Sequence, residues 1–398
     1  MNCLPHWGDK AISIYLDHNA GAPLRPEVKR AIADFLCEEE GNPASVHRAG
    51  QRARKALEGA RGQVASLIGS EPRRIVFTSG GTESNNMAIF GTALAAAHRR
   101  KIVSSMIEHS SVLAPLSELE QRGFEIVRIA PDCEGRISPD SVVAEIDANT
   151  ALVTLALANS EVGSILETPK IAEAASAVGA VFHLDAAQAA GRIAVDISVL
   201  GCDLMTLSAH KLGAPAGIGA LYIRDAARIA PRMSGGPQES GMRAGTPNLI
   251  GAVAFGASAE AARLAMAEES ARVAMFASSL LERLRASIPD LRLNGSANDR
   301  LPNTLNLTFP GVLGETMLIA LDLEGVEVSM GSACAAGAVE ASHVLRAMGL
   351  SDGDARSSLR ISLGWNTTAT DIDTAATTIA RVWRRVAVNE PLGSEAAS

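Results

Sequence analysis

The sequence predicts an α/β protein, and two observations predict this class. Between residues 74 and 223, short runs rich in β-branched residues alternate with Ala-rich helical stretches, which is the pattern of consecutive β-α-β units. After residue 248 the alternation stops, and a long helical stretch leads into a smaller portion of mixed helices and strands. We therefore expect a large domain built on a mostly parallel seven-stranded sheet, and a smaller α+β domain.

The strands of the expected sheet are short apolar runs. A run of about four to eight apolar residues is typical of a strand that is buried on both faces. Helical stretches at 83–97 and 170–178 separate several of these runs. In chain order, the expected strands are residues 74–78, 101–105, 125–129, 151–157, 180–184, 204–207 and 219–223. Ligands of such sheets bind beyond the carboxyl ends of the strands, so the residues that follow the strands are the first candidates for a site.

The second portion begins with one long helix, expected over 256–288, in which Leu281, Leu284 and Ile288 recur at helical spacing. A last helix is expected to begin at Thr370, an N-cap candidate with acidic residues in the turn that follows. Strands are expected between these helices, near 304–308, 326–329 and 359–363.

The domain boundaries follow from this division. We expect a large domain over 17–258 and a small domain made of 1–16 and 259–398. The extended apolar residues 12–16 could pack with either portion, and we assign them to the small one. The tail 389–398 contains Pro, Gly, Ser and Glu, a composition typical of a disordered end.

Composition and charge restrict the class of protein. Of 398 residues, 47% are hydrophobic and 20% charged, as in a globular protein, and the net charge of −8 argues against nucleic acid or an anionic membrane as a main partner. There is no apolar run of about 18 residues and no secretory signal at the start, so we expect a cytoplasmic protein that does not span a membrane. The five cysteines are scattered without a Cys-x-x-Cys pair, which argues against a disulfide framework or a structural metal site.

Polar residues follow two neighbouring strands of the expected sheet. Asp185 and Gln188 come after the fifth strand, and Ser208, His210 and Lys211 come after the sixth. A lysine amine can form a Schiff base with pyridoxal phosphate, and a carboxylate can keep the pyridine nitrogen protonated so that the ring takes up electrons. The alternative is a surface lysine and an N-capping aspartate, which describes most such pairs. Because both groups are expected at one edge of the sheet, a pyridoxal phosphate site is favoured.

Two further segments end at the same sheet edge. Gly81 and Thr82 open the helix after the first strand, where a glycine allows close approach of a ligand and free N–H groups favour a phosphate. Such a turn is also a common helix start, but a Schiff-base lysine elsewhere favours a phosphate cup. His109 follows the second strand, where it could stack on a pyridine ring and move protons. A lone histidine is otherwise more often structural.

Cys334 differs from the other cysteines because of its neighbours. The segment 329–337 reads Ser-Met-Gly-Ser-Ala-Cys-Ala-Ala-Gly, which holds little that could build a core. The other four cysteines are interpreted as small buried hydrophobic residues. An accessible thiol on a mobile loop is free to act as a nucleophile, and we expect Cys334 to be one.

Together these pieces resemble the cysteine desulfurases of the nitrogen-fixation and iron–sulfur type. These enzymes are class-V aminotransferase-like proteins with the fold type I of pyridoxal phosphate-dependent transferases. The resemblance covers nearly the whole chain in order. The matching segments are residues 15–20, 41–45, 78–85, 185–188, 208–211, 242–246, 331–334 and 357–364.

The resemblance implies a role for each matching residue at the cofactor. Lys211 would hold pyridoxal phosphate as a Schiff base, Asp185 would pair with the ring nitrogen, and Gln188 would pair with the phenolic oxygen. His109 would stack over the ring. The residues implied at the phosphate are Gly81, Thr82, Ser208, His210 and, from the partner subunit of a homodimer, Thr246.

The resemblance also implies the reaction. Arg360, helped by Asn42, would bind the carboxylate of L-cysteine, since a guanidinium suits a bidentate carboxylate. Cys334 would take the sulfur as a persulfide, leaving L-alanine, and would pass it to an iron–sulfur scaffold or another acceptor protein. The same residue could contact a nascent iron–sulfur cluster.

Two departures from the family pattern and two alternatives remain. Ser160 stands where such enzymes usually carry a cofactor-binding Asn, which puts this contact in doubt, and the chain lacks the extended C-terminal segment of the housekeeping enzymes. The second departure favours the nitrogen-fixation-like subtype. One alternative is a selenocysteine lyase or another β-eliminating enzyme, which need not depend on Cys334. The other is a catalytically silent partner in cluster assembly, against which the intact set of site residues argues.

Overall fold

The structure is a computed structural model that describes residues 13–37, 41–96, 98–225, 227–331 and 341–389. Its largest sheet has seven strands in the order β2-β8-β7-β6-β5-β3-β4. Only β8 runs antiparallel to its neighbours, so the expected mostly parallel seven-stranded sheet is confirmed. The strands are β2 (Ile75–Thr78), β3 (Lys101–Ser105), β4 (Glu125–Ile129), β5 (Thr150–Ala156), β6 (Val181–Asp185), β7 (Leu204–Ser208) and β8 (Gly219–Ile223).

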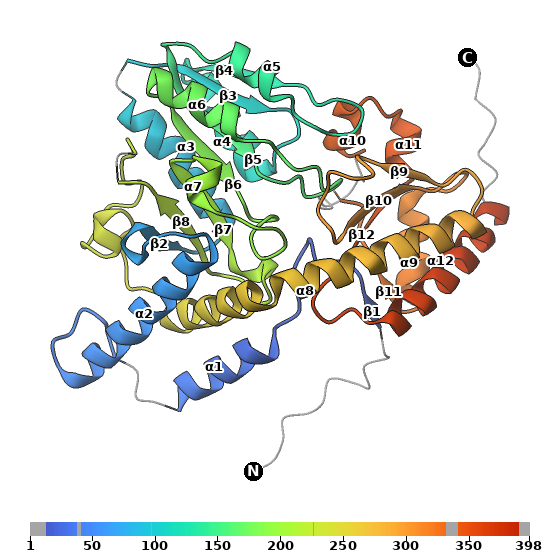
Figure 1. Ribbon diagram of the computed structural model, residues 1–398, viewed down its shortest axis with the longest axis horizontal. Helices are drawn as coiled ribbons and strands as arrows, with labels where there is room; N and C mark the ends of the chain where they lie inside the picture. Colours follow the sequence, from blue (N-terminus) through green and yellow to red (C-terminus); the bar gives the residue numbers. More distant parts are fainter. Residues whose placement is uncertain (1–12, 38–40, 97, 226, 332–340, 390–398) are drawn as a thin grey trace.

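Helices cover both faces of this sheet because its strands alternate apolar side chains between two hydrophobic clusters (Figure 1). On one face lie α3 (Gly81–Ala95) and α4 (Ser110–Gln121), which contribute Ala88 and Leu116 to one cluster. The other face packs against α2 (Arg48–Leu67), α6 (Pro169–Val178) and the first part of α8 (Leu249–Ser287). The remaining helices of this portion are α1 (Pro26–Leu36), α5 (Pro139–Ala144), α7 (Ile197–Leu200) and the 3₁₀ turns Pro72–Arg74, Ala209–Lys211 and Glu239–Gly241.

The second portion is built on a three-stranded antiparallel sheet with the order β12-β10-β9. A separate parallel pair joins β1 to β11, so the N-terminal apolar residues pack with this portion. The strands are β1 (Ile14–Tyr15), β9 (Arg292–Asn294), β10 (Thr304–Thr308), β11 (Val326–Glu327) and β12 (Ser358–Ser362). The remaining helices of this portion are α9 (Gly314–Leu323), α10 (His343–Ala347), α11 (Asp352–Arg356) and α12 (Ala369–Asn389), of which α12 packs against α8.

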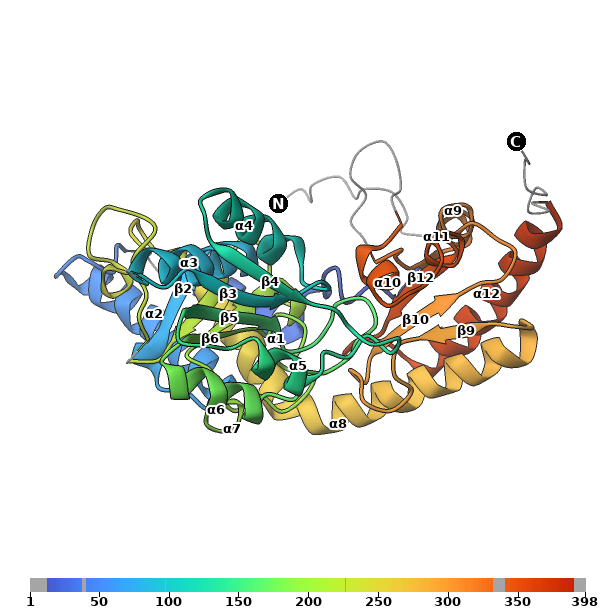
Figure 2. The same cartoon turned by 90° about the horizontal axis from the view of Figure 1, so that it is seen from above.

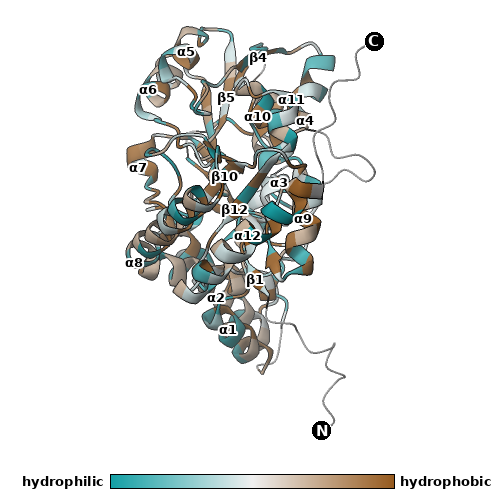
Figure 3. Cartoon of the chain, turned by 90° about the vertical axis from the view of Figure 1, so that its right-hand side faces the viewer, coloured by the Kyte–Doolittle hydropathy of each residue, from teal (hydrophilic) through white to brown (hydrophobic). Residues whose placement is uncertain are grey.

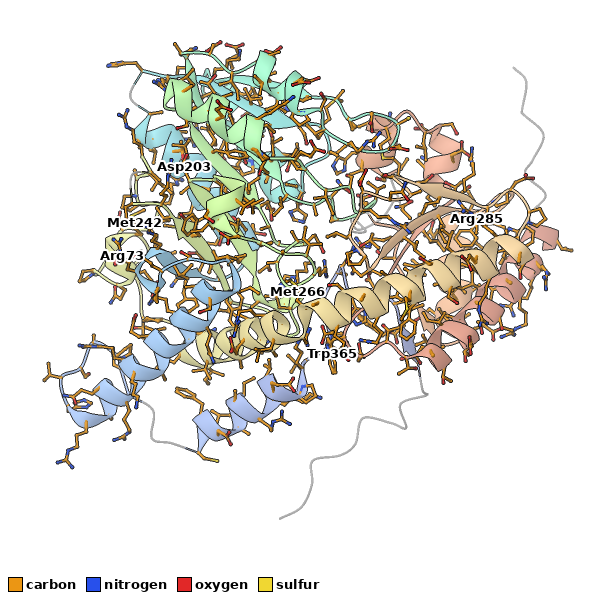
Figure 4. All side chains as sticks on the ribbon, in the orientation of Figure 1. Arg73, Asp203, Met242, Met266, Arg285 and Trp365 are labelled. Atoms are coloured by element: carbon orange, nitrogen blue, oxygen red, sulfur yellow. The ribbon has the colours of Figure 1, made fainter. Side chains whose placement is uncertain are left out.

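The helix α8 runs the length of both portions, as Figure 2 shows. Met266 and Arg285, labelled in Figure 4, mark its middle and its far end. Its residues up to Ala262 belong to the cluster under the large sheet, whereas those from Val273 belong to the cluster of the second portion. We propose that the two domains divide within this helix.

The helix α8 is also the one helix of the described residues that is long and apolar enough to cross a membrane by length and composition. In its most apolar stretch 44% of the residues are buried inside the protein. Hydrophilic residues interrupt the helix along its length (Figure 3). Because its buried residues belong to the two hydrophobic clusters, α8 has the packing of a core helix.

Two helix starts differ from those expected. The helix α8 begins at Leu249 rather than at residue 256, because the Asn248 side chain accepts the N–H of Gly251 and caps it. The helix α12 begins at Ala369, and its cap is Thr368 rather than Thr370. The Thr368 hydroxyl accepts the N–H of Asp371, and the Asp371 carboxylate accepts the N–H of Thr368, which is a capping box.

Candidate active site at the carboxyl ends of the strands

A cavity of about 270 Å³ lies at the carboxyl ends of β3, β5, β6 and β7. This is where a parallel sheet is expected to bind its ligand. Its lining contains most of the residues that the sequence indicated, because neighbouring parallel strands end at one edge. The lining residues are Gly81, Thr82, Asn85, Ile107, His109, Ser111, Ala156, Ala158, Asn159, Ser160, Asp185, Ala187, Gln188, Ser208, His210 and Lys211.

Lys211 lies in the 3₁₀ turn after β7, where its amine reaches the cavity. Its Nζ donates hydrogen bonds to the main-chain oxygens of Asn19 at 2.6 Å and Ala20 at 2.7 Å. The pKa of Lys211 is lowered to about 7, mainly by burial and also by the guanidinium groups of Arg192 and Arg360. A substantial fraction of the amine is therefore neutral near pH 7, the form that attacks a carbonyl.

Asp185 is held at the end of β6 by two hydrogen bonds. Its Oδ1 accepts the N–H of Ala187 at 3.0 Å, and its Oδ2 accepts from Asn85 Nδ2 at 2.7 Å. The second hydrogen of Asn85 Nδ2 goes to Ser111 Oγ at 2.8 Å, and Ser111 Oγ lies 2.7 Å from His109 Nδ1. Asp185 and His109 are therefore joined through two side chains from different helices.

The N-terminus of α3 faces the cavity next to Ser208 and His210. The N-cap residue is Gly80, which has no side chain to cap the helix. Within the described chain, the N–H groups of Gly81 and Thr82 have no hydrogen-bond partner. Burial lowers the pKa of His210 to about 4, with Lys211 and other cations adding to the effect, so this imidazole is neutral. The arrangement suits an anion such as a phosphate.

Gln188 is fixed by groups on both sides of its amide. Its Nε2 donates to the main-chain oxygen of Asn19 at 3.0 Å, and its Oε1 accepts from Arg192. Arg192 also donates to the main-chain oxygen of His18 at 3.0 Å. Burial lowers the pKa of Arg192 to about 9, and Arg360 acts in the same direction. Arg192 and Arg360 therefore both lie close enough to Lys211 to lower its pKa.

Arg360, on β12, does not line the cavity but is bonded to its wall. Its Nη1 donates to the main-chain oxygen of Ser160 at 3.2 Å, and its Nη2 donates to Asp17 at 2.7 Å. Its Nε is buried and has no partner among the described residues. Arg360 is 4% exposed, and because one of its donors is unused, its guanidinium can bind a further anion such as a carboxylate.

Two other expected site residues, Asn42 and Thr246, are not brought to this cavity. Asn42 lies at a separate cavity of about 430 Å³, where its side chain accepts the N–H of Ala44. Thr246 is exposed and does not line the cavity with Lys211. Cys334 lies outside the described residues. Ser329, five positions before it, pairs through its main chain with Arg360.

The structure adds site residues that the sequence interpretation missed. Asn19 supplies a carbonyl to both Lys211 and Gln188, and it comes from the N-terminal segment, far away in sequence. Asn85 and Ser111 connect Asp185 to His109. Asn85 follows Gly81 by four positions and so shares its helix face, a signal that was available in the sequence.

Comparisons with known proteins identify the family. The aminotransferase class-V profile matches residues 14–374. A cysteine desulfurase IscS of Dictyoglomus turgidum is 42% identical, covering 96% of this chain and 97% of its own. A cysteine desulfurase of Trichormus azollae is 39% identical, covering 96% of each chain. Among solved structures, a NifS-like protein superimposes with a TM-score of 0.88 at 31% identity, covering 94% of this chain and all of that one, and one from Rickettsia africae superimposes at 0.83 and 30%, covering 94% and 99%. The chain therefore belongs to the class-V aminotransferase family and, within it, to the cysteine desulfurases.

Proposed function

We propose that this protein uses pyridoxal phosphate to convert L-cysteine to L-alanine and passes the sulfur, as a persulfide on Cys334, to an acceptor protein of iron–sulfur cluster assembly. The observation that carries the proposal is the lysine with a lowered pKa in one cavity with a held carboxylate. Lys211 and Asp185 are the two groups that pyridoxal phosphate chemistry requires.

The donor set of the cavity fits this cofactor. Lys211 would hold the cofactor through its amine, Asp185 would pair with the ring nitrogen, Gln188 would pair with the phenolic oxygen, and His109 would stack on the ring. When bound, the cofactor takes up the electrons released as the Cα proton of the substrate leaves. The phosphate would be bound by the free N–H groups of Gly81 and Thr82 and by the side chains of Thr82, Ser208 and His210.

The chain's own residues then carry the reaction. Arg360, whose Nε has no partner among the described residues, binds the substrate carboxylate. Lys211, as a neutral amine, takes the Cα proton. The Cys334 thiolate attacks the substrate sulfur, so a sulfur–sulfur bond forms while the bond between Cβ and sulfur breaks. Cβ keeps that electron pair and takes up a proton, and Lys211 returns its proton to Cα, which gives alanine.

The position of Cys334 in the chain is compatible with this attack. Ser329 pairs with the main chain of Arg360, and Cys334 follows it by five positions. Five residues of chain can span at most about 18 Å. A free thiol is only a few per cent thiolate at pH 7, with a pKa of about 8.5, so the site must supply a proton acceptor for it.

Thr246 and Asn42 support a homodimer. Both lie away from the cavity of their own subunit, and Thr246 is exposed. We propose that Thr246 reaches the phosphate of the partner subunit, so that two copies complete each site. Ser160 lines the cavity, but its hydrogen bonds to Asn19 and Arg360 use its main-chain oxygen, so they do not support a contact of its hydroxyl with the cofactor. The cytoplasmic location stays a prediction.

The product assay tests the proposed function. The full chain, loaded with pyridoxal phosphate and given L-cysteine with a thiol reductant, should release alanine and sulfide in equal amounts. L-selenocysteine is the comparison substrate. Preference for selenocysteine by more than about tenfold would favour the lyase, and pyruvate in place of alanine would favour a β-eliminating enzyme. Neither product from either substrate would indicate a catalytically silent partner.

We expect the rate of cofactor attachment to report the pKa of Lys211. Because that pKa is lowered to about 7, the neutral amine is scarce below pH 7 and dominant above it. The rate of borohydride-trappable attachment should rise about tenfold per pH unit below 7 and level off above it. Nα-acetyl-lysine amide, whose pKa is near 10.4, is the control, and its rate should keep rising to about pH 10. A protein rate that rises in parallel with the control past pH 9 would contradict the lowered pKa.

A further inference from the structure

The hydrogen bonds around His109 define which ring nitrogen carries its proton. His109 is the N-cap residue of α4, and its Nδ1 accepts the main-chain N–H of Ser111 at 3.1 Å. A main-chain N–H can only donate, so Nδ1 must present its lone pair. In a neutral imidazole the proton is then on Nε2. Among the described residues, Nε2 has no hydrogen-bond partner, and the ring lines the cavity.

The hydrogen bonds that lead from Asp185 to His109 require the same tautomer of His109. Asp185 Oδ2 only accepts, so the Asn85 atom that lies 2.7 Å from it must be the amide nitrogen. The other hydrogen of that nitrogen points to Ser111 Oγ at 2.8 Å. Since Ser111 Oγ accepts there, its hydrogen is free for His109 Nδ1 at 2.7 Å. Both the hydroxyl and the main-chain N–H of Ser111 therefore point to His109 Nδ1, which must be the acceptor.

We propose that Asn85 and Ser111 are positioning residues that hold the neutral ring of His109 with its proton on Nε2, so that His109 donates a hydrogen bond into the cavity and does not accept the Cα proton. This rests on the proposed function, which then leaves Lys211 as the proton acceptor. The Nε2–H of His109 then stabilises an anionic centre in the cavity by a hydrogen bond, and the proton stays on the ring.

The charges around His109 agree with a neutral ring. Burial lowers the pKa of His109, and Lys211 and His343 lower it further, while Asp185 acts in the opposite direction. His210 is the remaining titratable group at the cavity, and burial keeps it neutral. Protonation of Nδ1 would also leave the main-chain N–H of Ser111 without its acceptor, which disfavours the imidazolium further.

The tautomer can be read from long-range ¹H–¹⁵N spectra of the full chain labelled at histidine. The chain has eight histidines, and a His109→Gln variant assigns the ring of interest. The wild-type protein should show the proton on Nε2, with and without added pyridoxal phosphate. In Ser111→Ala, one of the two hydrogen bonds to Nδ1 is lost, so the ratio of the two tautomers should move by about fivefold toward Nδ1–H. Ser111→Thr keeps the hydroxyl and should restore the wild-type ratio.

The matched control is Ser110→Ala, which removes the neighbouring hydroxyl at an exposed position and should leave the ratio unchanged. A proton on Nδ1 in the wild-type protein would overturn the proposal without any variant. An unchanged ratio in a folded Ser111→Ala would also overturn it. The spectrum needs no turnover, so failure of the proposed function would appear only in the product assay.

Discussion

Replacing Lys211 by alanine is expected to abolish covalent retention of pyridoxal phosphate and to reduce alanine formation from L-cysteine by about 10²–10⁴-fold or more. Two roles disappear together, because the same amine anchors the cofactor and takes the Cα proton. The substitution removes the Lys211 donor from the carbonyl oxygens of Asn19 and Ala20, but Asn19 keeps that of Gln188, and other hydrogen bonds hold this segment. The fold should therefore survive.

The measurement combines peptide mapping with the product assay. After borohydride reduction, wild-type protein should carry a pyridoxyl group on the peptide that contains Lys211, and the variant should carry none. Lys170→Ala is the matched control, since Lys170 is an exposed lysine on α6 whose partner is Asp140. That variant should behave as the wild type in both assays. A pyridoxyl group on another lysine, or near-normal alanine formation by Lys211→Ala, would end the cofactor assignment.

The large sheet was predictable because its strands are buried on both faces. Each such strand reads as a continuous apolar run, and the seven runs fell within a few residues of the seven strands. The pairing of β1 with β11 was not predictable in the same way. It joins Ile14 to Val326, and a two-residue strand has no pattern that names a partner so far away in sequence. Helix starts were missed where a cap, such as Asn248 or Thr368, precedes the apolar pattern.

The features of the site can likewise be divided into those that the sequence could predict and those that it could not. Asp185 and Lys211 could be placed together because neighbouring parallel strands end at one edge, which is a property of the topology. The contacts of Asn19 with Lys211 and Gln188 depend on tertiary packing of the N-terminal segment against the sheet, which no local pattern specifies. Burial shifts of pKa likewise arise only in the folded chain, so the lowered pKa of Lys211 could not be read from the sequence.

Replacing Cys334 by alanine should reduce alanine formation from L-cysteine by at least about 100-fold, the low end of the cost of losing a positioned catalytic group. Binding of the cofactor and of L-cysteine should persist, because neither step needs this thiol. Selenocysteine should be less affected, since selenium leaves carbon more readily than sulfur. The effect on turnover, with binding retained, separates a nucleophile from a residue that only stabilises the fold.

The expectation that the other cysteines are buried is wrong for Cys37 and Cys133, which are exposed free thiols, whereas Cys202 is buried. Cys133→Ala and Cys37→Ala are therefore the controls for this variant and should leave turnover unchanged. Wild-type protein treated with L-cysteine and then alkylated should carry one additional sulfur on the peptide with Cys334, and a thiol acceptor should remove it. If Cys334→Ala keeps near-normal turnover of L-cysteine, the sulfur leaves without attack by this thiol. A β-eliminating reaction at the same Lys211 site would then account for the chemistry, because that reaction needs the lysine and the carboxylate but no nucleophilic cysteine.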